Sequence, residues 1–156
     1  MPKQKQIYAR PDLCTGCRIC ANACALVHRG AVNPRLGAIR IRQDLVERYE
    51  FQEICRHCDE PPCVDACMAG CISKDPKTGL VIQDQSRCVG CWMCLMVCPY
   101  GAVRRDVARE VAIKCDRCDG RKVPACVEVC PTGALVLEVR EDAAEEPFFT
   151  EPTVAS

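Results

Sequence analysis

The stretch Cys88-Val89-Gly90-Cys91-Trp92-Met93-Cys94-Leu95-Met96-Val97-Cys98-Pro99 decides the fold that this sequence can adopt. Its four cysteines are spaced C-x2-C-x2-C-x3-C. Three thiolates in so tight a loop can hold three corners of a cubane iron-sulfur cluster, whereas the fourth cysteine lies one helical turn away and points elsewhere. In motifs of this kind the fourth cysteine ligates a second cluster.

Three further groups of four cysteines follow the same plan: the first group has identical gaps, and the second and fourth have a wider gap before the third cysteine. The four groups are Cys14, Cys17, Cys20 and Cys24; Cys55, Cys58, Cys63 and Cys67; Cys88, Cys91, Cys94 and Cys98; and Cys115, Cys118, Cys126 and Cys130. A zinc site needs four ligands, typically two pairs, and gives no reason for a repeated triplet with an offset fourth cysteine. We therefore predict sixteen iron ligands and four 4Fe-4S clusters, with a non-redox zinc or assembly protein as the alternative.

The composition agrees with a fold organised by bound metal. Seventeen of the 156 residues are cysteines, and aromatic residues make up only 4%. The polar start of the chain, residues 1–6, shows no export signal, which predicts a cytoplasmic protein and disfavours disulfides. No run approaches the roughly 20 apolar residues that a membrane span requires, so we expect no direct membrane span.

The charge balance argues against nucleic-acid binding. Lys plus Arg and Asp plus Glu both total 21, so the formal net charge is zero. Such a chain lacks the basic excess of nucleic-acid-binding proteins. Four oxidised clusters with their thiolates would add about eight negative charges, and cluster charge is one determinant of reduction potential.

Internal repetition predicts the domain organisation. Residues 55–103 form one complete two-cluster module, with two short strands around an Asp-Pro-Lys-Thr-Gly turn within residues 72–82. Further strands are expected at 38–42, 101–104 and 133–139. The predicted fold is α+β, with two nested ferredoxin-like modules, short helices on the cysteine loops and small antiparallel hairpins. The predicted units are an outer module of residues 1–54 and 104–140, an inner module of residues 55–103, and an extended tail of residues 141–156.

No sequence motif for substrate chemistry is present. The chain contains neither a dinucleotide-binding G-x-G-x-x-G after a strand, nor a P-loop, nor a nucleophile motif. We therefore predict that the chain is not an enzyme by itself and carries electrons for a separate catalytic chain.

The motifs resemble the four-cluster iron-sulfur subunits of dimethyl sulfoxide reductases, formate dehydrogenases, formate hydrogenlyase and carbon monoxide dehydrogenase systems. The resemblance covers roughly residues 5–140. It depends on Cys-Thr-Gly-Cys-Arg-Ile-Cys at 14–20, Cys-Arg-His-Cys-Asp-Glu-Pro-Pro-Cys at 55–63, Cys-Val-Gly-Cys-Trp-Met-Cys at 88–94 and Cys-Pro-Tyr-Gly-Ala at 98–102.

This resemblance implies four ligand sets and a row of clusters. The sets are Cys14, Cys17, Cys20 and Cys130; Cys24, Cys115, Cys118 and Cys126; Cys55, Cys58, Cys63 and Cys98; and Cys67, Cys88, Cys91 and Cys94. In relatives the cluster on the first group usually lies nearest the catalytic subunit. The expected partner is a tungsten or molybdenum enzyme such as an aldehyde oxidoreductase, with a flavin or ferredoxin as a further redox partner. The alternatives are a subunit linked to carbon monoxide dehydrogenase or hydrogenase, or a free soluble polyferredoxin.

Several positions depart from the pattern or leave two interpretations. Ala25 and Met68 stand where proline is common after the fourth cysteine, which predicts less shielding from water. Cys71 falls on a non-ligand position: a buried free thiol is preferred, and ligand exchange with Cys67 is the alternative.

Two side chains beside the ligands and the tail also have competing interpretations. His57 is interpreted as a packing or hydrogen-bonding group that stabilises cluster sulfurs rather than as a proton carrier. Trp92 is interpreted as a shield against solvent rather than a tunnelling group. The tail, with Phe148 and Phe149, is either disordered or an anchor on a neighbouring chain.

Overall fold

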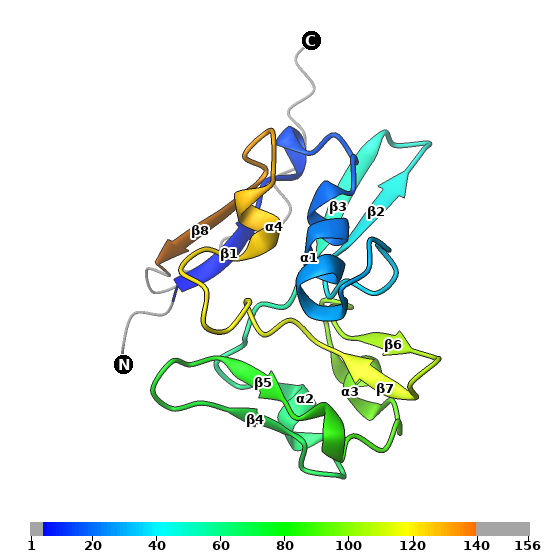
Figure 1. The fold of residues 1–156 in the computed structure, drawn as a ribbon, viewed down its shortest axis with the longest axis vertical. Coiled ribbons are helices and arrows are strands. Elements are labelled where there is room, and N and C mark those ends of the chain that lie inside the picture. Colours follow the sequence, from blue (N-terminus) through cyan, green and yellow to red (C-terminus); the bar gives the residue numbers. More distant parts are fainter. Residues whose placement is uncertain (1–4, 140–156) are drawn as a thin grey trace.

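Four two-stranded antiparallel ribbons make up the sheet structure of this computed structural model, which describes residues 5–139 (Figure 1). The strands are β1 (Lys5–Ala9), β2 (Arg40–Asp44), β3 (Tyr49–Glu53), β4 (Ile72–Lys74), β5 (Val81–Gln83), β6 (Arg104–Asp106), β7 (Val111–Ile113) and β8 (Leu135–Val139). Three ribbons are local hairpins, β2–β3, β4–β5 and β6–β7. The fourth pairs β1 with β8, so the two ends of the described chain lie side by side.

Each α-helix carries the third cysteine of one group. The helices are α1 (Ile19–Arg29), α2 (Pro62–Asp65), α3 (Met93–Val97) and α4 (Ala125–Glu128), with 3-10 turns at η1 (Pro11–Leu13) and η2 (Gln85–Arg87). α2 begins with a proline, whose fixed φ suits the first turn of a helix. α1, the longest helix, ends at Gly30 in the left-handed conformation that glycine adopts without strain. The helices therefore present cysteines at the ends of tight loops.

The core has two parts that are built around thiols. One contains Ile7, Ile39, Ile41 and Leu135 together with cysteines of the first and fourth groups. The other surrounds Val81 and contains cysteines of the second and third groups. α1 packs against α4, and α2 packs against α3. Figure 1 shows the first pair of helices with β1, β2, β3 and β8, and the second pair with β4 to β7.

The predicted α+β character is confirmed by these hairpins and short helices. The hairpin expected within residues 72–82 is present as β4–β5. The strand expected at 38–42 lies at Arg40–Asp44, and the strand expected at 101–104 begins only at Arg104. β1, β3 and β7 were not expected from the sequence.

Two findings concern the ends of the chain and the membrane. The predicted tail at 141–156 lies outside the described residues, so the structure does not address its two interpretations. Among residues 5–139, no helix combines the length and the apolar character that crossing a bilayer requires.

Candidate metal centres

The loop between the first two cysteines of each group has a left-handed residue at the same place. The residue before the second cysteine has positive φ in all four groups: Gly16, His57, Gly90 and Arg117. This conformation is uncommon outside glycine and marks a constrained loop. The positive φ turns the chain back on itself. In the two groups where this residue is not glycine, its backbone N–H donates to the Sγ of the first cysteine. The N–H of His57 donates to Cys55 Sγ at 3.4 Å, and the N–H of Arg117 donates to Cys115 Sγ at 3.3 Å.

Gly90 also has a steric reason to be glycine. A Cβ at this position would lie 2.4 Å from the backbone oxygen of Glu110, which follows β6 in the next hairpin. The cysteine loop therefore lies directly against the turn between β6 and β7. Trp92, two residues later, packs its ring under the Arg105 guanidinium at 4.4 Å and lines the same hollow as Cys91. This position is compatible with the shielding interpretation, which stays a prediction.

Three hollows in the protein are each lined by cysteines from two different groups. We name them by one member each. The Cys14 hollow is lined by Cys14, Cys17, Cys20 and Cys130; the Cys55 hollow by Cys55, Cys58, Cys63 and Cys98; and the Cys88 hollow by Cys67, Cys71, Cys88, Cys91 and Cys94. In every case three thiols come from one loop and the others from a distant stretch of chain.

The remaining four predicted ligands, Cys24, Cys115, Cys118 and Cys126, are all buried. Cys126 interacts electrostatically with Cys24 and Cys118, and Cys115 interacts with Cys126 and Cys24. The structure thus brings this set together as well.

Burial holds many of these thiols in the neutral form when no cation is present. It raises the pKa of Cys20 to about 12, and the pKa of Cys63 and of Cys94 to about 11. For Cys115, burial raises the pKa well above the usual value. Because the metal-binding form is the thiolate, such thiols ionise only against a bound metal. Groups of four convergent soft sulfur donors fit iron-sulfur clusters.

Cys67 and Cys71 form a close thiol pair at the edge of the Cys88 hollow. Their Sγ atoms are 3.4 Å apart, and the backbone N–H of Cys71 donates to Cys67 Sγ at 3.3 Å. Burial raises the pKa of Cys71. Burial acts on Cys67 too, but hydrogen bonds from the Cys71 side chain and backbone outweigh it and lower the pKa of Cys67. Cys67 is therefore the better thiolate of the pair.

Polar side chains with unpartnered buried atoms line the three hollows. Within the described part of the chain, both side-chain amide atoms of Gln52 lack a hydrogen-bond partner beside the Cys14 hollow, as do both of Gln83 beside the Cys88 hollow. In the Cys55 hollow the same is true of His57 Nε2. Burial, with Lys114 and Arg117 nearby, lowers the pKa of His57 to about 3, which makes the ring neutral. A neutral ring is compatible with the packing or hydrogen-bonding interpretation of His57, which stays a prediction. Gln52 and Gln83 were missed, because no spacing signal marks them.

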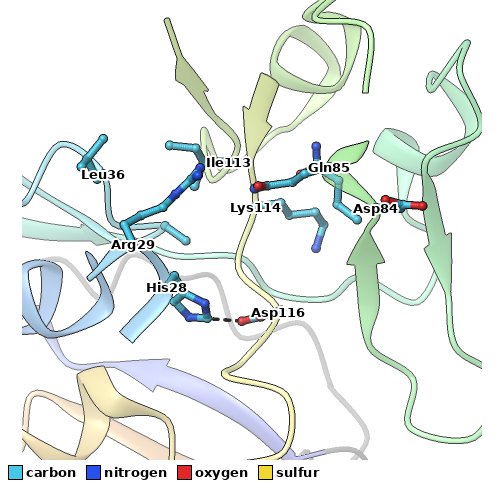
Figure 2. Close-up of a pocket in the computed structure, with 10 residues that line it drawn as sticks. His28, Arg29, Leu36, Asp84, Gln85, Ile113, Lys114 and Asp116 are labelled. Atoms are coloured by element: carbon cyan, nitrogen blue, oxygen red, sulfur yellow. Dashed lines mark ion pairs between the residues drawn. The ribbon is translucent and has the colours of Figure 1, made fainter. Parts of the chain in front are cut away.

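His28 lies beside a predicted ligand, a contact that the sequence did not indicate. Its Nε2 is 3.5 Å from Cys118 Sγ and 3.5 Å from a carboxylate oxygen of Asp116. Figure 2 shows this ion pair on one wall of a polar pocket of about 310 Å³, with Asp84 and Gln85 on the opposite side. Because Cys118 belongs to a predicted ligand set, these residues are part of the same metal-binding region.

Comparison with known proteins agrees with this geometry. Residues 46–140 match the family of 4Fe-4S dicluster domains, and residues 11–27 match a 4Fe-4S binding domain.

The chain belongs to the 4Fe-4S dicluster family.

Two relatives are named as subunits of enzymes. The chain is 36% identical over 124 residues to the polyferredoxin-like subunit of aliphatic sulfonate oxidoreductase of Pyrococcus furiosus, covering 80% of this chain and 70% of the relative. It is 38% identical over 127 residues to subunit beta of the NADH-dependent phenylglyoxylate dehydrogenase of Aromatoleum evansii, covering 80% of this chain but only 28% of that longer protein.

A solved structure shares the fold. A chain of the active-site complex BamBC of benzoyl-coenzyme A reductase, with 1,5-dienoyl-CoA, superposes with a TM-score of 0.55 at 24% identity, covering 96% of this chain and 83% of that chain. The prediction of a multi-cluster ferredoxin-type protein is thus confirmed. The relatives are named as subunits, which agrees with the prediction that the chain is not an enzyme by itself.

Proposed function

We propose that this chain is an electron-transfer subunit that relays electrons through four 4Fe-4S clusters between a catalytic oxidoreductase subunit and another redox partner. The observation that carries the proposal is the convergence of thiols from two groups in each of the three hollows. Bound there, each 4Fe-4S cluster would supply a centre that accepts and releases single electrons.

The proposed ligands are the four sets that the family resemblance implied. The set of Cys24, Cys115, Cys118 and Cys126 joins the Cys14 set in an outer module, and the Cys55 and Cys88 hollows form an inner module. The packing of α1 on α4 and of α2 on α3 supports this nested plan. The inner module extends beyond the boundary near residue 104, because Ala112 packs in its core, whereas Ile113 packs in the core of the outer module.

Contacts between the sets support a linear order. Cys20 of the first set interacts electrostatically with Cys126, and Cys115 interacts with Cys55. Cys63 in turn interacts with Cys94. The centres would therefore follow one another from the Cys14 hollow, through the buried Cys24 set and the Cys55 hollow, to the Cys88 hollow.

The two ends of this order are the places where partners would dock. Among the described ligand cysteines, Cys17 and Cys91 are the exposed ones, and they lie in the Cys14 and Cys88 hollows, respectively. Every cysteine of the Cys24 set is buried. Electrons would therefore enter and leave at the two ends, while the protein interior keeps water from the middle. Following the family resemblance, we place the catalytic subunit at the Cys14 end.

The narrower proposal for the partner is a tungsten or molybdenum enzyme. The relatives' names support a separate catalytic chain, because they describe subunits of an aliphatic sulfonate oxidoreductase and of a phenylglyoxylate dehydrogenase. Native purification from the source, with mass spectrometry and analysis for tungsten, molybdenum and nickel, tests this. We expect one large co-purifying chain with tungsten or molybdenum. A nickel-containing partner would favour carbon monoxide dehydrogenase or hydrogenase instead. Purification of the chain alone would favour a free polyferredoxin.

Iron and acid-labile sulfide analysis tests the proposal itself. Anaerobically prepared protein should contain about sixteen of each per chain, and its broad visible absorption should bleach with dithionite. Cys98→Ala and Cys130→Ala should each lower the iron content, because each removes the distant thiol from one hollow. A colourless protein with stoichiometric zinc would refute the redox function.

A further inference from the structure

Lys114 places an ammonium group in the interior of the protein. The residue directly follows β7 and is only 8% exposed. Its Nζ donates to Cys55 Sγ at 3.2 Å, to the backbone oxygen of Val81 at 2.5 Å and to the backbone oxygen of Cys115 at 3.3 Å. Within residues 5–139, no carboxylate forms an ion pair with it.

A buried ammonium without an anion is unfavourable. Backbone carbonyls satisfy part of its hydrogen bonding, but the charge still needs an opposite charge nearby. Lys114 lines the Cys55 hollow together with its four cysteines and donates to one of them, so metal-bound thiolates there would supply negative charge. Asp84 and Asp116 line the polar pocket that Lys114 also borders, but among residues 5–139 neither carboxylate forms an ion pair with it. The ammonium group of Lys114 would therefore pair with the negative charge of a cluster bound in that hollow.

His57 adds a second donor on the same hollow. Its Nδ1 accepts a hydrogen bond from the backbone N–H of Val81 at 3.0 Å, so the proton of the neutral ring lies on Nε2. That Nε2–H is buried and has no hydrogen-bond partner among residues 5–139. A buried donor without an acceptor costs free energy, and a cluster sulfur in the hollow would satisfy it.

Among residues 5–139, the other centres lack a comparable buried lysine or arginine. Arg18 lines the Cys14 hollow, but its side chain is exposed and donates to Gln43 Oε1 at 2.8 Å. No described lysine or arginine lines the Cys88 hollow. At the Cys24 set, half-buried Arg104 favours the Cys24 thiolate and exposed Arg121 favours the Cys118 thiolate, but the carboxylate of Asp116 opposes both more strongly.

We propose that Lys114 gives the centre in the Cys55 hollow the highest reduction potential of the four, so that an electron in transit rests there. The inference builds on the proposed function. Reduction adds negative charge to a cluster, and nearby positive charge and hydrogen bonds to sulfur stabilise that added charge. The electron would thus rest at an interior position of the row, one centre away from the Cys88 end.

A redox titration followed by electron paramagnetic resonance tests this role. The samples are the anaerobic loaded wild-type protein and the variants Lys114→Met, Lys114→Arg and Lys122→Met. In wild type one centre should be reduced before the others. In Lys114→Met that centre should shift to lower potential and lose its first place, whereas Lys114→Arg should keep it first. Lys122 is exposed, so Lys122→Met removes the same charge from the surface and should leave the order unchanged.

The outcomes separate this inference from the proposed function. Wild-type protein with far fewer than sixteen irons would refute the proposed function. Full iron content with unchanged reduction potentials in Lys114→Met would refute the role of Lys114 but leave the proposed function standing. An equal shift in reduction potential in Lys122→Met would do the same. If Lys114→Met does not retain its iron, Lys114→Gln replaces it, because the amide keeps a donor without the charge, and the same lowering is expected.

Discussion

At the scale of single residues, Cys67 and Cys71 show what spacing can and cannot predict. The spacing marked Cys67 as a ligand and left Cys71 as an extra thiol. The structure places both on the Cys88 hollow, with the pKa of Cys67 lowered and the pKa of Cys71 raised. A lowered thiol pKa favours the metal-binding form. The free-thiol interpretation of Cys71 therefore remains the preferred prediction.

Alanine variants of these two cysteines give opposite expected results. Cys71→Ala should retain about sixteen irons per chain, because its thiol is not needed as a ligand. Cys67→Ala should lose iron and one of the reducible centres. Both are measured by iron analysis and by integration of the electron paramagnetic resonance signal after reduction. Full iron content in Cys67→Ala would show instead that Cys71 can take its place.

The ligand residues could be predicted from sequence, but their surroundings could not. Cysteine spacing is local, and a loop that holds three corners of a cluster needs it whatever the remaining chain does. The burial of Gln52 and Lys114 depends on strands and loops that meet only in the folded chain. The contact of His28 with Cys118 joins residues 90 positions apart. No local pattern encodes such contacts.

At the scale of elements, the three local hairpins have turns of the same kind. Each turn begins with an aspartate, Asp44, Asp75 or Asp106, whose Oδ1 accepts from a backbone N–H two or three residues later. Each has a left-handed residue four positions after the aspartate, namely Arg48, Gly79 and Glu110. Only the turn with glycine was recognised from the sequence. The hairpins with Arg48 and Glu110 were missed because arginine and glutamate do not signal positive φ.

The positive φ in these turns predicts that two substitutions have opposite effects on the stability of the protein. Gly79→Ala should destabilise the protein by about 1 to 2 kcal/mol, because φ is +69° there and alanine is strained in that region. Glu110→Gly should stabilise it by up to about 1 kcal/mol, since it relieves the same strain. Stability is compared through the guanidinium concentration at which cluster absorption is lost.

An exposed position in the same turn supplies the control for these variants. Lys77→Ala changes a side chain in the turn of Gly79 without requiring positive φ, so it should have little effect. Equal midpoints for Gly79→Ala and Lys77→Ala would contradict the strain argument.

At the scale of the whole molecule, loading with clusters should change the net charge. The chain itself is formally neutral, with an isoelectric point of about 6.7. Four oxidised centres with their thiolates add about eight negative charges. Anaerobic isoelectric focusing of loaded and iron-free protein should therefore place the loaded form well below the iron-free form. Coincident bands, with about sixteen irons confirmed in the loaded sample, would contradict this charge assignment.

The pairing of β1 with β8 has a consequence for biosynthesis. Residues 5–9 are synthesised long before their partner strand, residues 135–139. Chains fold from the N-terminus as they are synthesised, so β1 must wait until β8 has been made, and the first cysteine loop must wait for Cys130. The two centres of the inner module would take no ligand beyond Cys98. We therefore expect metal delivery to the nascent chain to begin at the inner module and to finish beside the pair of β1 and β8.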